Sequence, residues 1–210
     1  MAMRDLSISV HFARAVLKNA VEQGLDPISL LRKNRISPRL LLEENARISI
    51  ERFADLQVSV MLAMGDEALG YTSRRMPLGA WSMMCHAVIG CETLGQAIAR
   101  YCRFYQLFDF GVHCVLEQDD DLAHIRLVGV DRVPRDAPYL CELVLFNVHR
   151  FSSWLAQEIL PLQAVELGYP PAAQLADYRD MFFASPVHFD CAESQLVLSR
   201  ALLDKRITQN

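Results

Sequence analysis

The chain has 210 residues, of which 52% are apolar and 22% are charged. This composition excludes a mainly disordered chain and supplies enough apolar material for a substantial hydrophobic core. The formal net charge is −4, from 21 basic and 25 acidic residues, whereas a free-standing nucleic-acid-binding domain usually carries a basic excess. We therefore expect no specific DNA binding by this chain alone.

The chain carries no pattern typical of a membrane or secreted protein. Its longest uncharged run, residues 76–91, contains a proline and a histidine and is shorter than the roughly 20 apolar residues that span a bilayer. Residues 1–12 include an early acidic residue and no long apolar block, so they are not a signal peptide. We expect a cytoplasmic protein without a membrane partner, whose cysteines stay reduced. The six cysteines form no C-x-x-C pair and are Cys85, Cys91, Cys102, Cys114, Cys141 and Cys191.

The first hundred residues predict helices, because apolar residues recur there at helical spacing and capping residues mark the starts and stops. The predicted helices are 8–23 with a stop at Gly24, one starting at Asp26-Pro27, one at Ser37-Pro38, one from Ser49 to Gly65, 80–89, and one from Thr93, where Gln96 completes a capping box.

The second half changes to a period of two, which indicates strands. A hairpin with one apolar face is expected at residues 110–128, around a turn of three aspartates. The remaining predicted elements are a buried helix from Pro138 to about Glu158, a strand at 163–168, a helix at 173–181, and strands at 187–189 and 196–198. The fold class is α+β, with a helical N-terminal half followed by a ββαβαββ mixed half. We expect one domain over 1–210, with a helical subdomain of about 1–109 and a mixed part of about 110–205.

The sequence offers no convincing catalytic or metal site. It has no G-x-S-x-G, H-E-x-x-H or glycine-rich phosphate loop, so we expect no enzyme and no cofactor. Cys85 and Cys91 are spaced too widely for a short zinc knuckle, and Cys102 lies on an apolar helix stripe, where a thiol acts as a small hydrophobe. We expect no metal, although a cysteine-based redox or metal sensor and a small enzyme stay open as alternatives.

Several residues could line a ligand pocket between the helix 138–158 and the region 81–105. Arg150 interrupts an apolar helix. A buried arginine needs a partner, either a protein carboxylate such as Glu142 or an anionic ligand, and the alternative is that Arg150 belongs to a solvent-facing strip. Tryptophan and methionine make adaptable apolar walls but are equally ordinary core, and buried tyrosines need partners for their hydroxyls. The candidate ligand-binding residues are Trp81, Met84, Tyr101, Tyr105, Phe146, Arg150 and Trp154.

Four segments in order along the chain resemble the N-terminal effector-binding (arabinose-binding-type) domain of AraC-family transcriptional regulators. They are GLDPISLLRKNRISPRLLLEENARISIERFADL at 24–56, ETLGQAIARYCRFYQL at 92–107, VELGYPPAAQLADYRDMFFASPVHFD at 165–190, and LLDKRITQN at 202–210. In the last segment, Arg206 stands where the family usually has a proline. The match is specific through the order and spacing of all four segments together.

The resemblance implies a sensor rather than a catalyst. Such a domain would bind a small-molecule effector of unknown identity, form a homodimer, and control DNA binding by a C-terminal pair of helix-turn-helix motifs. We expect that DNA-binding domain to be absent from this chain, which ends where it would begin. The effector would act by shifting the population of two conformers. A dimerisation module without a ligand remains a further alternative.

Overall fold

The computed structural model describes residues 7–108, 110–129, 138–171 and 175–207. These residues contain seven α-helices and seven β-strands, with helices concentrated in the N-terminal half and the larger sheet in the C-terminal half. The fold class is therefore α+β, as predicted. Contacts along the chain divide it into two compact units, Met1–Gly79 and Ala80–Asn210. The division follows Gly79 rather than residue 109, because the two helices after Gly79 belong with the sheet.

The first unit is mainly helical. Its helices bury Phe12, Val16, Leu31, Leu56 and Val60 in a common apolar core. Two three-residue strands pair antiparallel across 40 residues of sequence, with Ile8 opposite Ile48. The elements of this unit are β1 (Ser7–Ser9), α1 (Val10–Glu22), α2 (Pro27–Lys33), the 3₁₀ helix η2 (Pro38–Leu42), β2 (Arg47–Ser49) and α3 (Ile50–Met64).

Local capping explains most helix boundaries in this unit. The Asp26 carboxylate accepts hydrogen bonds from two backbone N–H groups of α2, at 3.0 and 3.1 Å. Ser49 caps α3, and Gly65 ends it in the left-handed region at φ 63°, which favours glycine. At Ser37 the side chain makes no cap hydrogen bond and only a 3₁₀ helix follows. The predicted start at Ser37-Pro38 is thus present, but the element is tighter than an α-helix.

A buried carboxylate organises the loop after α3. Asp66 is 2% exposed, and its two oxygens accept hydrogen bonds from the backbone N–H groups of Ala68, Gly70 and Met76, each at 2.9 Å. One side chain therefore satisfies three backbone donors of an irregular segment, as a buried carboxylate must be paired to be tolerated.

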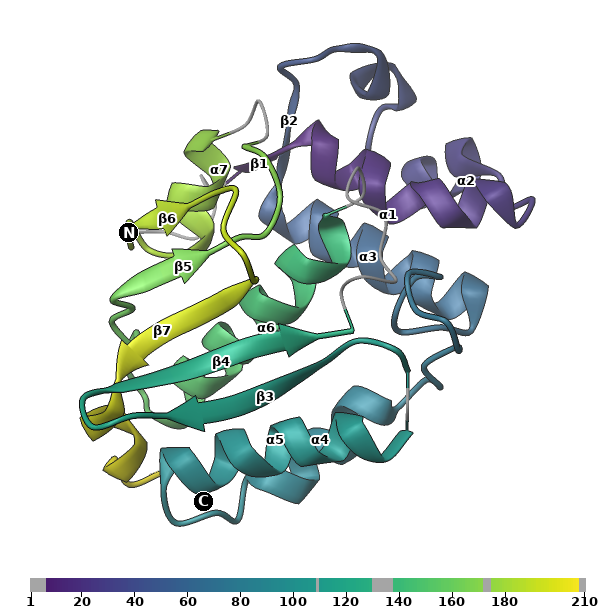
Figure 1. Cartoon of the computed structure of the whole chain (residues 1–210). Coiled ribbons are helices and arrows are strands. Elements are labelled where there is room, and N and C mark those ends of the chain that lie inside the picture. Colours follow the sequence, from purple (N-terminus) through teal and green to yellow (C-terminus); the bar gives the residue numbers. More distant parts are fainter. Residues whose placement is uncertain (1–6, 109, 130–137, 172–174, 208–210) are drawn as a thin grey trace. The chain divides into compact units, whose positions relative to one another are not determined.

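The second unit contains a five-stranded sheet in the order β3-β4-β7-β5-β6 (Figure 1). All neighbours pair antiparallel except β5 and β6, which run parallel. The chain order β3β4α6β5α7β6β7 confirms the predicted ββαβαββ arrangement. The elements are α4 (Ala80–Val88), α5 (Leu94–Phe108), β3 (His113–Gln118), β4 (Leu122–Val128), α6 (Tyr139–Leu155), β5 (Ala164–Glu166), α7 (Leu175–Met181), β6 (Val187–His188), β7 (Gln195–Ser199) and the 3₁₀ helix η4 (Arg200–Asp204).

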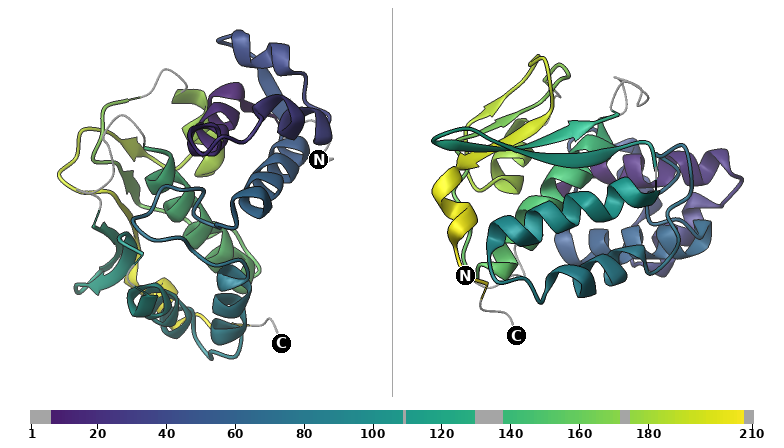
Figure 2. Two further views of the ribbon diagram at one scale, coloured as in Figure 1. Left: turned by 90° about the vertical axis from the view of Figure 1, so that its right-hand side faces the viewer. Right: turned by 60° about the horizontal axis from the view of Figure 1, so that its bottom comes forward.

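The pairing of residues between neighbouring strands shows which side chains share a face of this sheet. Cys114 lies opposite Leu127, and Ile125 and Val165 both lie opposite Leu196, which places these buried side chains on one face. α6 packs against β7, and α5 lies along β3 while also contacting α6 (Figure 2). The apolar face is therefore covered by helices, and the other face carries the polar residues of the alternation.

Backbone contacts fix the ends of these elements. Thr93 Oγ1 accepts from Gln96 N at 3.3 Å, and Gln96 Oε1 accepts from Glu92 N at 3.1 Å, so the capping interaction predicted for α5 is present. A Cβ at Gly129 would lie 1.8 Å from the Gly111 carbonyl oxygen, and glycine, which has no Cβ, avoids this clash. α6 ends at Leu155, three residues before the predicted end. The predicted start of α7 at residue 173 lies outside the described residues.

Candidate functional site

Three of the predicted ligand-binding aromatic residues meet on α4 and α5. Tyr101 and Tyr105 lie one turn apart on α5, with ring centroids 5.0 Å apart, and both are buried. Trp81, in the first turn of α4, makes an edge contact to Tyr101 at 6.5 Å. Burial raises the pKa of Tyr101 well above its ordinary value. We call Trp81, Tyr101 and Tyr105 the aromatic group.

α6 extends the aromatic group with two further rings. Phe151 makes an edge contact to Trp81 at 5.5 Å and stacks on Trp154 at 5.9 Å. Trp154 is 49% exposed, so the series of rings runs from the interior to the surface. Phe151 was not among the predicted ligand-binding residues, although Phe146, Arg150 and Trp154 of the same helix were.

Arg150, although next to Phe151 in the sequence, contacts different residues. Its guanidinium carbon lies 4.6 Å from the centroid of Phe183 and 5.7 Å from that of Phe146. The residue is exposed, and its partial desolvation lowers the pKa of Arg150 while the guanidinium stays charged. Arg150 is thus held by cation–π contacts rather than by an ion pair with Glu142.

The structure therefore divides the predicted ligand-binding residues into two sets. Trp81, Tyr101 and Tyr105 form the aromatic group, to which Trp154 is joined through Phe151. Phe146 and Arg150 form the second set, together with Phe183 from the segment after α7. Met84 on α4 is fully buried.

A buried polar cluster missed by the sequence reading lies between α6 and α7. Glu142 is 1% exposed, and its Oε1 accepts a hydrogen bond from the hydroxyl of Tyr178, which is 2% exposed. Among the described residues, Glu142 Oε2 has no hydrogen-bond partner. Burial raises the pKa of Glu142 to about 7, and the Tyr178 hydroxyl partly opposes that rise. Burial and the Glu142 charge raise the pKa of the neighbouring Tyr169.

His149 lies two turns along α6 from Glu142 and is 2% exposed. Its Nε2 donates to the Leu160 carbonyl at 2.9 Å, which requires the Nε2–H tautomer, and burial lowers the pKa of His149. Ser153 Oγ accepts from Leu160 N at 3.1 Å. These bonds anchor the segment after α6 to the helix, so His149 has an evident structural role.

The cysteines are mostly buried thiols. Cys85 and Cys191 are half-buried, and the other four are buried. Burial raises the pKa of Cys102 and of Cys141 to about 12, so the reactive thiolate is scarce at neutral pH. Within the described ranges, no group of three or more histidine, cysteine, aspartate and glutamate residues has the arrangement of a metal site.

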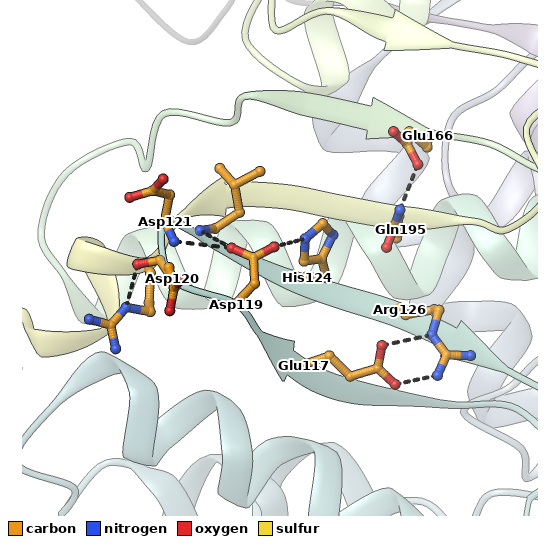
Figure 3. Close-up of polar contacts among 10 residues, drawn as sticks. Glu117, Asp119, Asp120, Asp121, His124, Arg126, Glu166 and Gln195 are labelled. Atoms are coloured by element: carbon orange, nitrogen blue, oxygen red, sulfur yellow. Dashed lines mark hydrogen bonds and ion pairs between the residues drawn. The ribbon is translucent and has the colours of Figure 1, made fainter.

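The open face of the sheet carries paired charges (Figure 3). Arg126 on β4 donates to both oxygens of Glu117 and, at 3.2 Å, to Glu193. His124 Nε2 lies 3.5 Å from Asp119 Oδ2, and Gln195 Nε2 donates to Glu166 at 2.6 Å. The arrangement is typical of a solvated sheet face, as the alternating pattern of the hairpin indicated.

None of the helices in the described part of the chain combines the length and the apolar character needed to cross a bilayer.

Comparisons with known proteins identify a family and a similar solved structure. No curated protein matches the chain. The transcriptional regulator CdpR from Pseudomonas aeruginosa is similar, with 20% sequence identity and a TM-score of 0.45 over 94% of this chain and 58% of that chain. This chain thus spans less than two thirds of that regulator's length. The family described as the arabinose-binding domain of AraC transcription regulators, N-terminal, matches residues 24–207. The chain therefore belongs to this family of regulatory ligand-binding domains.

Proposed function

We propose that this chain is the effector-sensing part of a transcriptional regulator, and that a separate domain of the same regulator binds DNA. The observation that carries the proposal is the family match over residues 24–207. The net charge of −4 supports the assignment of DNA binding to a separate domain, because DNA affinity depends on a basic surface. The regulator would act as a homodimer in the cytoplasm, since paired protein copies read paired DNA half-sites.

The aromatic group is the proposed effector site. Its supporting feature is a set of contacting rings that reaches from buried Tyr101 to half-exposed Trp154, with Met84 in the same helix as Trp81. Aromatic and methionine side chains form adaptable apolar walls. Arg150 belongs to the second set rather than to the aromatic group. We propose that its charge, held over Phe146 and Phe183, would bind an anionic or polar end of an effector that extends beyond the aromatic group.

The effector would act through a difference in affinity for two conformers of the domain. A ligand shifts a conformational equilibrium only by the difference between its affinities for the two states. The DNA-binding domain would sense the population of the conformer that binds the effector better.

The test begins with a thermal-shift screen of small molecules against the isolated chain. A molecule at 100 times its dissociation constant should add about 2.7 kcal/mol of stability. The molecule found is then added to cells that carry the whole regulator and a transcription reporter. An effector-sensing domain predicts a dose-dependent change in reporter output, and a hit that stabilises the domain without changing transcription contradicts the proposed function.

Site residues are tested by Trp81→Ala and Arg150→Ala in the same reporter. Arg103→Ala is a matched control, because Arg103 is exposed on α5. Circular dichroism confirms that each variant folds. Normal folding with a response equal to that of the parent in both site variants refutes this assignment of the site while leaving the regulatory role intact.

A further inference from the structure

The segments after two parallel strands carry Tyr169 and Phe189, and Phe189 contacts Tyr178, whose hydroxyl donates to Glu142. Tyr169 follows β5 and Phe189 follows β6, and the two segments are joined by a hydrogen bond from Asp190 N to the Tyr169 carbonyl at 3.0 Å. Ring centroids of Tyr169 and Phe189 are 6.3 Å apart, and those of Tyr178 and Phe189 are 5.2 Å apart. We call Glu142, Tyr169, Tyr178 and Phe189 the carboxylate cage.

Two buried carboxyl groups, Glu142 and Asp177, lie in or next to the carboxylate cage. Glu142 is 1% exposed and Asp177, next to Tyr178, is 3% exposed. Burial raises the pKa of Tyr178, and the charges of both carboxyls add to that rise. In the described part of the chain, no lysine or arginine forms an ion pair with Glu142 within 4.0 Å. A buried carboxylate is costly without a charged or hydrogen-bonding partner, and Glu142 Oε2 has none among these residues.

The chemistry of the cage selects among possible ligands. An anion would be repelled by Glu142 and Asp177. A hard metal ion takes six or more oxygen ligands, and the described residues provide no group of the kind that holds a metal. An organic ammonium group combines a positive charge for the carboxylate with a surface that binds the faces of aromatic rings.

We propose that the carboxylate cage binds the ammonium group of a small organic cation, with Glu142 Oε2 as the charged acceptor and Tyr169, Tyr178 and Phe189 as the aromatic walls. β5 and β6, whose following segments carry Tyr169 and Phe189, lie at the end of the sheet opposite β3, and α5 packs along β3 (Figure 1). This binding site is distinct from the aromatic group, and its test reads binding directly, so it neither depends on nor decides the transcriptional role.

The experiment compares cations with neutral molecules of the same shape. Choline is paired with 3,3-dimethylbutan-1-ol, and n-butylamine with n-butanol, and binding to the folded chain is measured by calorimetry at pH 8. At least one cation should bind at least tenfold more tightly than its neutral counterpart, which corresponds to about 1.4 kcal/mol. Equal binding within both pairs, or no binding by either cation up to 20 mM (roughly 2.3 kcal/mol of affinity,), overturns the proposal.

Variants identify the acceptor. Glu142→Gln keeps the shape and the Tyr178 hydrogen bond but removes the charge, and it should weaken cation binding at least tenfold. Glu92→Gln is the control, because Glu92 is exposed before α5, and it should bind as the parent does. Undiminished binding by Glu142→Gln refutes the role of the carboxylate.

Tyr178→Phe provides a second, independent readout. Loss of the hydroxyl removes the contact that lowers the pKa of Glu142, so the pH at which cation binding reaches half its maximum should move upward. Besides Tyr178, the titratable groups of the described residues that interact with Glu142 are Tyr169 and Cys141, and Asp177 acts on Tyr178. These stay in place in the variant. An unchanged pH midpoint contradicts binding to the ionised Glu142.

Discussion

Glu142→Gln should change how the stability of the protein depends on pH. Burial raises the pKa of Glu142 from its ordinary value of 4.5 to about 7. Between these values the folded protein holds a proton that the unfolded chain releases, so the free energy of unfolding falls as the pH rises. The stabilisation is complete below pH 4.5 and is lost as the pH passes 7. A rise of this size, at about 1.4 kcal/mol per pH unit, amounts to about 3 kcal/mol.

Glutamine cannot ionise, so the variant lacks this pH-dependent loss. Its amide also buries N–H donors in place of Oε2, which has no hydrogen-bond partner among the described residues, and this adds a cost that does not vary with pH. The informative quantity is therefore the difference in free energy of unfolding between parent and variant as a function of pH. Glutamine should gain about 2.5 kcal/mol relative to the parent between pH 5 and pH 8, which is most of the full effect.

Urea unfolding at half-unit steps of pH, followed by circular dichroism and fluorescence, measures this difference. Glu92→Gln, which changes an exposed carboxyl, should follow the parent curve at every pH. Parallel curves for the parent and Glu142→Gln would show that the buried carboxyl has an ordinary pKa, and the reasoning from burial would then be wrong.

Four other measurements test the structure. Asp66→Ala should lower the free energy of unfolding by about 3 kcal/mol, since three backbone donors lose their acceptor, whereas exposed Asp55→Ala should leave thermal unfolding almost unchanged. With a thiol reagent at pH 8, only half-buried Cys85 and Cys191 should react before unfolding, and rapid labelling of three or more cysteines would contradict the burial of the rest. In gel-shift assays the chain alone should not bind duplex DNA specifically, and nanomolar binding that survives moderate salt would refute this expectation. Light scattering at high micromolar concentration should give the mass of a dimer, and a monomeric mass would count against the proposed assembly.

Elements that depend on local signals could be predicted from the sequence. Asp26-Pro27, Ser49 with Gly65, and Thr93 with Gln96 act within one or two helical turns, and all three mark helix boundaries in the structure. β1 and β2 were missed, because each has three residues and their pairing joins segments 40 residues apart. No periodicity can emerge from three residues.

Residues of the candidate site were predictable only where one element supplies them. Tyr101 and Tyr105 lie one turn apart on the same helix, so their contact follows from spacing alone. The hydrogen bond between Tyr178 and Glu142 joins residues 36 positions apart on two helices, and the sequence around either residue does not predict this contact. For Arg150 the sequence left a buried, paired arginine and a solvent-facing strip open, and the structure shows an exposed position on α6.

α6 reaches both proposed sites: it carries Glu142 of the carboxylate cage in its first turn, and Phe151 near its last turn contacts Trp81 of the aromatic group. A hydrogen-bonded helix moves largely as one rod, so a ligand that displaces either end also displaces the other. Occupancy at one end would then alter affinity at the other, and thermodynamics requires the same factor in both directions. Because α6 contacts both sites, binding of two chemically unrelated molecules would be coupled, and the conformation of the domain would depend on both.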